Sequence, residues 1–190
     1  MRPAKDYAIP LSGWFHMAIL FHMEHSSAHS FQIGVVSLGE HLGDPISGDF
    51  RSPQKRMAEI IDAAQLADEA GLDFFGVGEH HRLDYVVSAV PMVLGAIAQR
   101  TKQIRLTSAV TVLSTADPVR EFENYATLDL VSQGRAEMIV GRGAFVESYA
   151  LFGHDISQYD ELFPENIDLL MKLNQAERIT WQGKYRPALK

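Results

Sequence analysis

The feature that most constrains the fold is an alternation that begins at Phe31, in which short runs of β-branched and aromatic residues are followed by longer amphipathic stretches. This alternation is typical of βα units, whose consecutive strands lie parallel in one sheet. Strands are predicted to begin at Phe31, Leu72, Ile104 and Ala136, and the last two intervals are equal. The sequence therefore predicts an α/β protein with about four βα units.

N-cap residues and helix-terminating glycines set the expected boundaries of the helices. Ser52-Pro53 and Asp117-Pro118 place an N-cap residue before a proline at the first helical position, and Gly71 and Gly134 end the first and third helices. The second helix is expected to begin near Ser88 or Pro91, and the fourth follows a loop from Gly141 to about Tyr159. The expected strands are 31–38, 72–78, 104–113 and 136–140.

Residues 1–30 are expected to form an N-terminal extension outside the core, so that the domain comprises residues 31–190. Arg2 and Lys5 precede an apolar stretch, residues 14–21, in an order that imitates a secretory signal. His16 and His22 interrupt or adjoin that stretch, which is too short to span a bilayer. An extension that plays no part in the fold is the favoured interpretation.

Composition excludes several classes of binding partner and site. The net charge is -7, and the acidic residues are spread along the chain, which argues against a nucleic-acid footprint and against a polybasic membrane patch. There is no cysteine, so no disulfide, thiolate nucleophile or zinc-thiolate site is available. We expect a small-molecule partner, no nucleic acid, no membrane and a cytoplasmic location.

Two architectures accommodate repeated βα units, an open doubly wound sheet and a (β/α)₈ barrel. The loop after the first strand lacks the G-x-G-x-x-G pattern, since Gly39 is followed by residues 40–44 with the sequence EHLGD. A Rossmann dinucleotide site is therefore not expected. In either architecture the working residues gather at the carboxyl ends of the strands, where the chain places Ser37, Glu79, His80, His81, Ser114, Thr115 and Arg142.

His80 and His81 are adjacent on an extended segment, so their side chains point to opposite sides and cannot readily chelate one metal ion. No H-E-x-x-H spacing occurs, and no metal site is predicted. Either histidine could exchange a proton during redox chemistry, or it could merely hydrogen-bond a neighbouring loop. Spacing alone leaves both interpretations open.

Arg142 lies between Gly141 and Gly143, a pattern suited to holding a phosphate because glycine lets the backbone approach the ligand. The alternative is an ion pair with a rim carboxylate such as Glu79. No G-x-S-x-G elbow anchors a hydrolase triad, and nothing in the sequence sets the separation that a glycosidase pair of Glu79 and Glu147 would need.

Several motifs, taken in order and with their spacing, resemble the bacterial luciferase-like family of flavin-dependent monooxygenases over residues 31–187. They are ADEAGLD at 67–73, EHH at 79–81, IRLTSAV at 104–110, LSTADP at 113–118, LDLVSQGR at 128–135, VGRG at 140–143 and YALFG at 149–153. The resemblance implies the N-terminal half of a TIM (β/α)₈ barrel, truncated before barrel closure. It also implies reduced FMN, or deazaflavin F420 in one branch, and oxidation of a small organic substrate, with O₂ in the FMN enzymes.

Carried over by position, the resemblance assigns catalytic roles to His80 and His81. Arg142, with Gly143 beside it, matches a contact to the flavin phosphate, and Ala109 and Val110 fall where the family often has a non-prolyl cis peptide against the flavin ring. Rim positions Ser37, Glu79 and Ser114 complete the expected cofactor-binding set. Two residues depart from the family pattern, because Asp117 stands where histidine is common and Ser114 where proline is common.

Four strands cannot close a barrel, which leaves the first and fourth strands as open edges. We therefore expect that the polypeptide is a fragment of a longer gene product or buries its open side in a homodimer. A separate flavin reductase is a further expected partner. The alternatives to an FMN monooxygenase are an F420-dependent oxidoreductase and a noncatalytic flavin-binding subunit.

Overall fold

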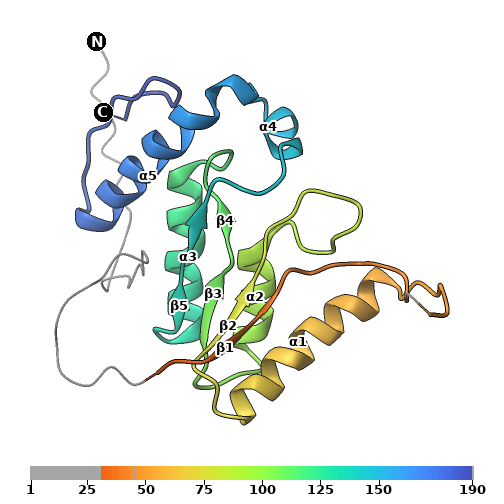
Figure 1. Cartoon of the computed structure of the whole chain (residues 1–190). Coiled ribbons are helices and arrows are strands. Elements are labelled where there is room, and N and C mark those ends of the chain that lie inside the picture. Colours follow the sequence, from red (N-terminus) through yellow and green to blue (C-terminus); the bar gives the residue numbers. More distant parts are fainter. Residues whose placement is uncertain (1–30, 45, 190) are drawn as a thin grey trace.

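The computed structural model describes residues 31–44 and 46–189, so the extension expected at residues 1–30 lies outside the described residues. Four strands form one parallel sheet in the order β1-β2-β3-β5 (Figure 1). They are β1 (Gly34–Ser37), β2 (Phe74–Val77), β3 (Arg105–Ser108) and β5 (Ala136–Glu137). Sequential strands are neighbours, as the βα alternation predicts, and β1 and β5 are the edges of this sheet.

The helices follow the strands in the expected order. They are α1 (Pro53–Glu69), α2 (Val90–Ala98), α3 (Pro118–Ser132), α4 (Glu147–Leu151) and α5 (Tyr159–Gln175), with a short 3₁₀ helix at Ile156–Gln158. The Ser52 hydroxyl accepts a hydrogen bond from the amide of Lys55, and the Asp117 carboxylate accepts from two amides of α3. Both predicted caps are therefore confirmed.

One face of the sheet forms the core. Phe75, Val77, Leu106 and Ala136 are buried together with side chains from α1, α2, α3 and α5. On the other face Gly76 lies against Val36, Thr107 and Ala109, since a Cβ at Gly76 would come within 3.0 Å of Val36 Cγ2 and 3.2 Å of Ala109 Cβ. This second face would point into the interior of a closed barrel.

The third strand was predicted as one run, 104–113, and that prediction is wrong in one respect. The peptide bond between Ala109 and Val110 is cis, and the strand divides there into β3 and β4 (Thr111–Val112). The fourth strand divides into β5 and β6 (Val140–Gly141), and β4 pairs with β6 in a separate two-stranded sheet. The Ser108 hydroxyl bridges the break, because it donates to the Ile139 carbonyl at 2.8 Å and accepts from the Ile139 amide at 3.0 Å.

Other boundaries also differ from the expectation. The first strand is shorter than 31–38, and Phe31, Ile33, Val35 and Val36 are exposed. The segment 141–159 was expected to be a loop but contains α4 and the 3₁₀ helix. Among the described residues no helix is long and apolar enough to cross a bilayer.

Candidate functional site

The carboxyl ends of β2 and β6 deliver the predicted polar residues to one edge of the molecule. β2 ends at Val77 and is followed by Gly78 and then the segment Glu79-His80-His81, and β6 ends at Gly141 before Arg142 and Gly143. Because all strand pairs are parallel, these segments lie at the same end of their strands. A small cavity of about 20 Å³ forms there, lined by residues 79–82 and 143–145 with Val112, Glu147 and Ser148.

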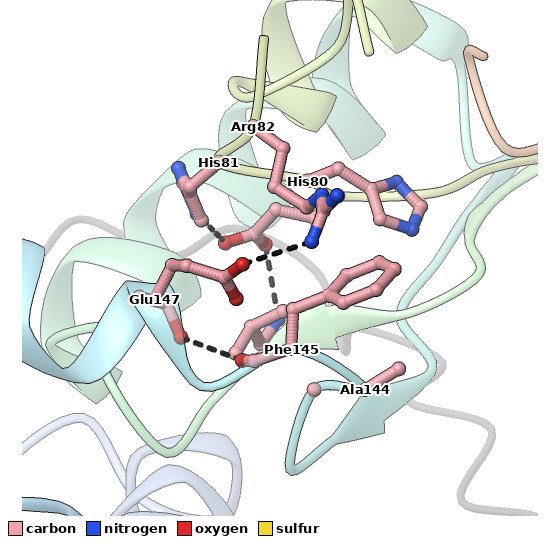
Figure 2. A pocket seen from close by; sticks show the side chains of 10 residues that line it. His80, His81, Arg82, Ala144, Phe145 and Glu147 are labelled. Carbon is pink, nitrogen blue, oxygen red and sulfur yellow. Dashed lines mark hydrogen bonds and ion pairs between the residues drawn. The ribbon is translucent and has the colours of Figure 1, made fainter. Parts of the chain in front are cut away.

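Glu79 joins the two sides of this cavity. One carboxylate oxygen lies 2.7 Å from Nε2 of His81, and the other accepts a hydrogen bond from the Val112 amide at 3.0 Å (Figure 2). The side chains of Glu79 and His81 are only 12% and 10% exposed. A hydrogen bond to a charged group in such a place is worth about 1.5–3 kcal/mol, so Glu79 fixes the loop after β2 against β4.

His80 points to the other side, as adjacent residues on an extended segment should. Its ring stacks on Tyr85 at a centroid distance of 3.8 Å and lies tilted against Phe145 at 5.7 Å. Burial lowers the pKa of His80, and this effect outweighs the backbone of Leu38 and the nearby carboxylates, which favour the charged form. Nδ1 is buried without a hydrogen-bond partner among the described residues, and burial favours the neutral imidazole.

Arg82 closes the cavity on its outer side. Its guanidinium donates to Glu147 at 2.8 Å and to Asp84 at 2.9 Å, and it lies 4.5 Å from the centre of the Phe145 ring (Figure 2). Beyond this bridge an open groove of about 640 Å³ runs along residues 80–86, Ser88 and α4. The glycosidase alternative gains no support, because Glu79 and Glu147 line one cavity but each is bonded to a basic side chain.

Arg142 lies at the predicted edge but outside the residues that line the cavity or the groove. Its guanidinium is 2.9 Å from Asp160 and lies over the rings of Tyr159 and Phe163. The ion-pair alternative was thus right in kind, although the partner is Asp160 and not Glu79. Asp160 is 88% exposed, so this pair adds little stability and the guanidinium could exchange it for another anion.

The other predicted residues are divided between the cavity and its surroundings. Gly143 lines the cavity with a φ of 81°, and a Cβ there would come within 2.8 Å of Val112 Cγ1. Ala109 and Val110 form the expected cis peptide. Ser114 is fully buried and Ser37 caps the Gly39 amide, but neither serine lines the cavity or the groove.

Arg82, Phe145 and Ser148 line the cavity but were missed in the sequence. Arg82 directly follows the two histidines and could have been included on that ground. Phe145 and Ser148 belong to a segment expected to be a loop, and no periodicity marks them. Among the described residues, no group of three or more acidic or histidine side chains is placed to hold a metal ion.

Comparison with known proteins identifies the family. The model of luciferase-like monooxygenases matches residues 31–190. The chain belongs to the luciferase-like monooxygenase family. It is 30% identical over 128 residues to an alkanal monooxygenase alpha chain from the Kryptophanaron alfredi symbiont, covering 65% of this chain and 36% of that protein. It is also 28% identical over 136 residues to an F420-dependent glucose-6-phosphate dehydrogenase of Amycolatopsis mediterranei, covering 67% and 40%.

Solved structures confirm the partial-barrel fold. A monooxygenase from Streptomyces bottropensis matches with a TM-score of 0.74 and 24% identity over 84% of this chain and 47% of that one. The oxygenating constituent of a 3,6-diketocamphane monooxygenase from Pseudomonas putida, in complex with FMN, matches with a TM-score of 0.72 and 20% identity over 85% and 44%. The chain spans 36–42% of the length of the first curated relatives that it matches. Relatives and similar structures include both FMN and F420 proteins.

Proposed function

We propose that the chain provides the histidine-bearing side of a flavin site in a monooxygenase that uses reduced FMN and O₂ to oxidise a small organic substrate. The observation that carries this proposal is the neutral His80, whose Nδ1 has no partner among the described residues at the edge where β2 and β6 end. The family resemblance assigned a catalytic role to His80 and a contact with the flavin phosphate to Arg142, at this same edge. Proteins of this family with FMN or monooxygenase in their names support the choice of cofactor and reaction.

The residues at this edge fit a flavin. The groove of about 640 Å³ has the size of a small-molecule site, whereas the inner cavity of about 20 Å³ holds no more than about one water. The aromatic faces of His80 and Tyr85 suit a planar ring. Arg142 would hold the phosphate after leaving Asp160, and Gly143 lets the backbone approach.

Reduced FMN, when bound, would supply the electrons that activate O₂. The protein would contribute a proton acceptor or donor at Nδ1 of His80, since a neutral imidazole can serve either role near neutral pH. Glu79 and His81 would keep the loop after β2 in place through the bonds to each other and to Val112. The Arg82–Glu147 bridge and Phe145 lie between the groove and the inner cavity, and they would restrict the entry of water from the groove into that cavity.

FMN binding to the full chain, followed by flavin fluorescence, tests the proposal. His80→Ala and Arg142→Ala should each weaken binding by about tenfold or more, because each removes a directional contact to the ligand. Arg120→Ala is the matched control, since its exposed guanidinium pairs with Glu123 on α3 and lies outside the residues that line the cavity and the groove. Binding that is unchanged in both site variants would contradict the residue assignments.

An F420-dependent oxidoreductase is the second candidate, favoured by the similarity to the Amycolatopsis dehydrogenase. That reaction transfers a hydride and consumes no O₂, so reduced FMN and F420 assayed side by side distinguish the two. Tight flavin binding without turnover of either kind would instead indicate a noncatalytic flavin-binding subunit.

We further propose a cytoplasmic protein that forms a homodimer and receives reduced FMN from a separate flavin reductase. The support for the dimer is the exposed β1 edge, where Ile33, Val35 and Val36 are 53%, 43% and 45% exposed. Sedimentation of the full chain should give a dimer that Val36→Lys dissociates. A stable wild-type monomer would contradict the dimer.

A further inference from the structure

The Tyr85 ring covers one face of the His80 imidazole. The two rings stack at a centroid distance of 3.8 Å with an interplanar angle of 12°, and both residues line the groove. Tyr85 belongs to the loop after β2, which is closed by a hydrogen bond from the His80 amide to the Val87 carbonyl at 2.9 Å. What keeps Tyr85 on His80 therefore depends on what holds this loop.

The loop after β1 pairs with the segment that carries Tyr85. Glu40 and Tyr85 face each other in an antiparallel β-bridge. Backbone hydrogen bonds of 2.8 Å flank this bridge on either side, from the His41 amide to the Asp84 carbonyl and from the Val86 amide to the Gly39 carbonyl. We call the paired segments 39–41 and 84–86 the loop pair. Because of these bonds, the position of Tyr85 follows the position of the loop after β1.

Arg56, near the N-terminus of α1, bonds the loop pair to that helix. Its Nε–H donates to the Glu40 carbonyl at 2.9 Å, and its guanidinium lies 3.7 Å from the carboxylates of both Glu40 and Glu59. A hydrogen bond from a charged guanidinium is stronger than one between neutral groups, and its fork fixes the direction of the contact. Arg56 therefore bonds to the residue that lies directly opposite Tyr85.

Apolar packing contributes little to the attachment of the loop after β1. Its large apolar side chains Leu38, Leu42 and Phe50 are exposed, so they bury little surface against the helices. The His41 ring lies 2.6 Å from the Arg51 carbonyl, which belongs to the same loop and cannot fix that loop to α1. The bond from Arg56 to Glu40 is thus a main attachment of the loop pair to α1.

We propose that Arg56 is a positioning residue for the candidate site: its bond to Glu40 holds the loop pair, and the loop pair keeps the Tyr85 ring on His80. Without the guanidinium, the loop after β1 moves away from α1 and the Tyr85 ring leaves the imidazole. The groove then loses the stacked wall that suits a planar ligand. The consequence for FMN rests on the proposed function, whereas the stacking is a property of the free protein and can be tested without a flavin.

NMR of the uniformly labelled full chain without flavin is the test. A stacked aromatic ring shifts the carbon-bound protons of an imidazole upfield, so the Hδ2 and Hε1 signals of His80 report the Tyr85 ring directly. Tyr85→Leu gives the positions of these signals without stacking. Arg56→Met keeps the apolar stem and removes the guanidinium, and it should move both signals most of the way to the Tyr85→Leu positions. A loss of stability alone would not move the signals of the folded protein.

Arg51→Met is the matched control. The Arg51 guanidinium pairs with the same Glu59 at 2.9 Å, but its side chain is 58% exposed, whereas that of Arg56 is 26% exposed. The His80 signals should therefore stay at their wild-type positions in Arg51→Met. His80 signals that also stay there in folded Arg56→Met would overturn the proposal, because the loop after β2 would then be held by its own bond from His80 to Val87.

The wild type alone decides the question if Arg56→Met does not fold. Its Arg56 Nε–H should exchange slowly with water, because the proton is held by the Glu40 carbonyl, and the rings of Tyr85 and His80 should show nuclear Overhauser contacts. A rapidly exchanging Nε–H, or rings without such contacts, would overturn the proposal.

An FMN titration extends the test to the ligand. Arg56→Met should bind FMN at least about threefold more weakly than the wild type, as Tyr85→Leu should, whereas Arg51→Met should bind as the wild type does. Wild-type affinity in Arg56→Met would contradict a positioning role for Arg56 in binding. A wild type that does not bind FMN would count against the proposed function, while the His80 signals would still decide whether Arg56 holds Tyr85 in place.

Discussion

Two hydrogen-bonded pairs of an acidic and a basic side chain at the same edge of the molecule behave differently. Glu79 and His81 are almost fully buried, and the second oxygen of Glu79 holds the Val112 amide, whereas Arg142 and Asp160 lie at the surface with Asp160 88% exposed. The buried pair fixes two loops, while the exposed pair leaves its arginine free to exchange partners. The comparison teaches that a strand end determines where a residue lies, but burial determines whether its partner is permanent.

The largest expected effect is on the buried pair. Glu79→Ala leaves the His81 imidazole and the Val112 amide without their partner and should lower the free energy of unfolding by about 3 kcal/mol. Urea unfolding monitored by circular dichroism measures the loss. Asp160→Ala, the matched change in the exposed pair, should cost less than about 0.5 kcal/mol. Equal losses in the two variants would remove the distinction between the pairs.

Glu121→Gln sharpens the comparison through pH. Burial raises the pKa of Glu121 from 4.5 to about 7, so the folded state holds its proton more tightly than the unfolded state. The stabilising contribution is fully present below pH 4.5 and is lost as the pH rises through about 7. Glu121→Gln should therefore be more stable than the wild type at about pH 8, by about 2 kcal/mol, and the two should converge in acid. Urea unfolding of both proteins at about pH 8 and in acid measures this change. A difference in the free energy of unfolding that is the same at both pH values would contradict the prediction.

A smaller effect is expected for the half-exposed bridge between Arg82 and Glu147. A double-mutant cycle of Arg82→Ala and Glu147→Ala should give a coupling free energy of about 0.5–1 kcal/mol, between the values for the two extreme pairs. Thermal unfolding of the four proteins provides the numbers. A coupling near 3 kcal/mol would mean that the bridge acts as a buried pair despite its exposure.

The smallest effect concerns the exposed pair and the ligand. Asp160→Asn removes the resident anion from Arg142 and should tighten FMN binding by about twofold to threefold, because the guanidinium no longer has to leave a partner. A fluorescence titration with FMN detects this change. Weaker binding in the variant would show that Asp160 helps to hold the arginine in place for the ligand.

The sequence predicted what depends on chain order and local periodicity. The strand order, the capped starts of α1 and α3 and the common edge for Glu79 and Arg142 all follow from parallel βα units, and the structure confirms them. The opposed directions of His80 and His81 also followed from extended geometry. These properties need no knowledge of which distant side chains meet.

Other properties depend on contacts between distant segments and could not be read in advance. The division of the third strand lies where the Ser108 hydroxyl bonds the amide and the carbonyl of Ile139, a residue far away in the sequence. The partner of Arg142 depends on where the α5 N-terminus lies, and α4 is too short to show a helical period. Glu121 has the spacing of an ordinary surface residue near a helix start, and only the packed structure shows that its Oε2 is buried without a hydrogen-bond partner among the described residues.

The central claim is that the ends of β2 and β6 form one flavin-binding edge. An FMN titration of the labelled full chain, followed by amide chemical shifts, tests it most directly. The amides of residues 79–82 and 143–145 should shift together, while those of Gly71 and Gly134 at the opposite ends of the strands should not. Shifts confined to the region of Gly71 and Gly134, or no shift at millimolar FMN, would contradict the account.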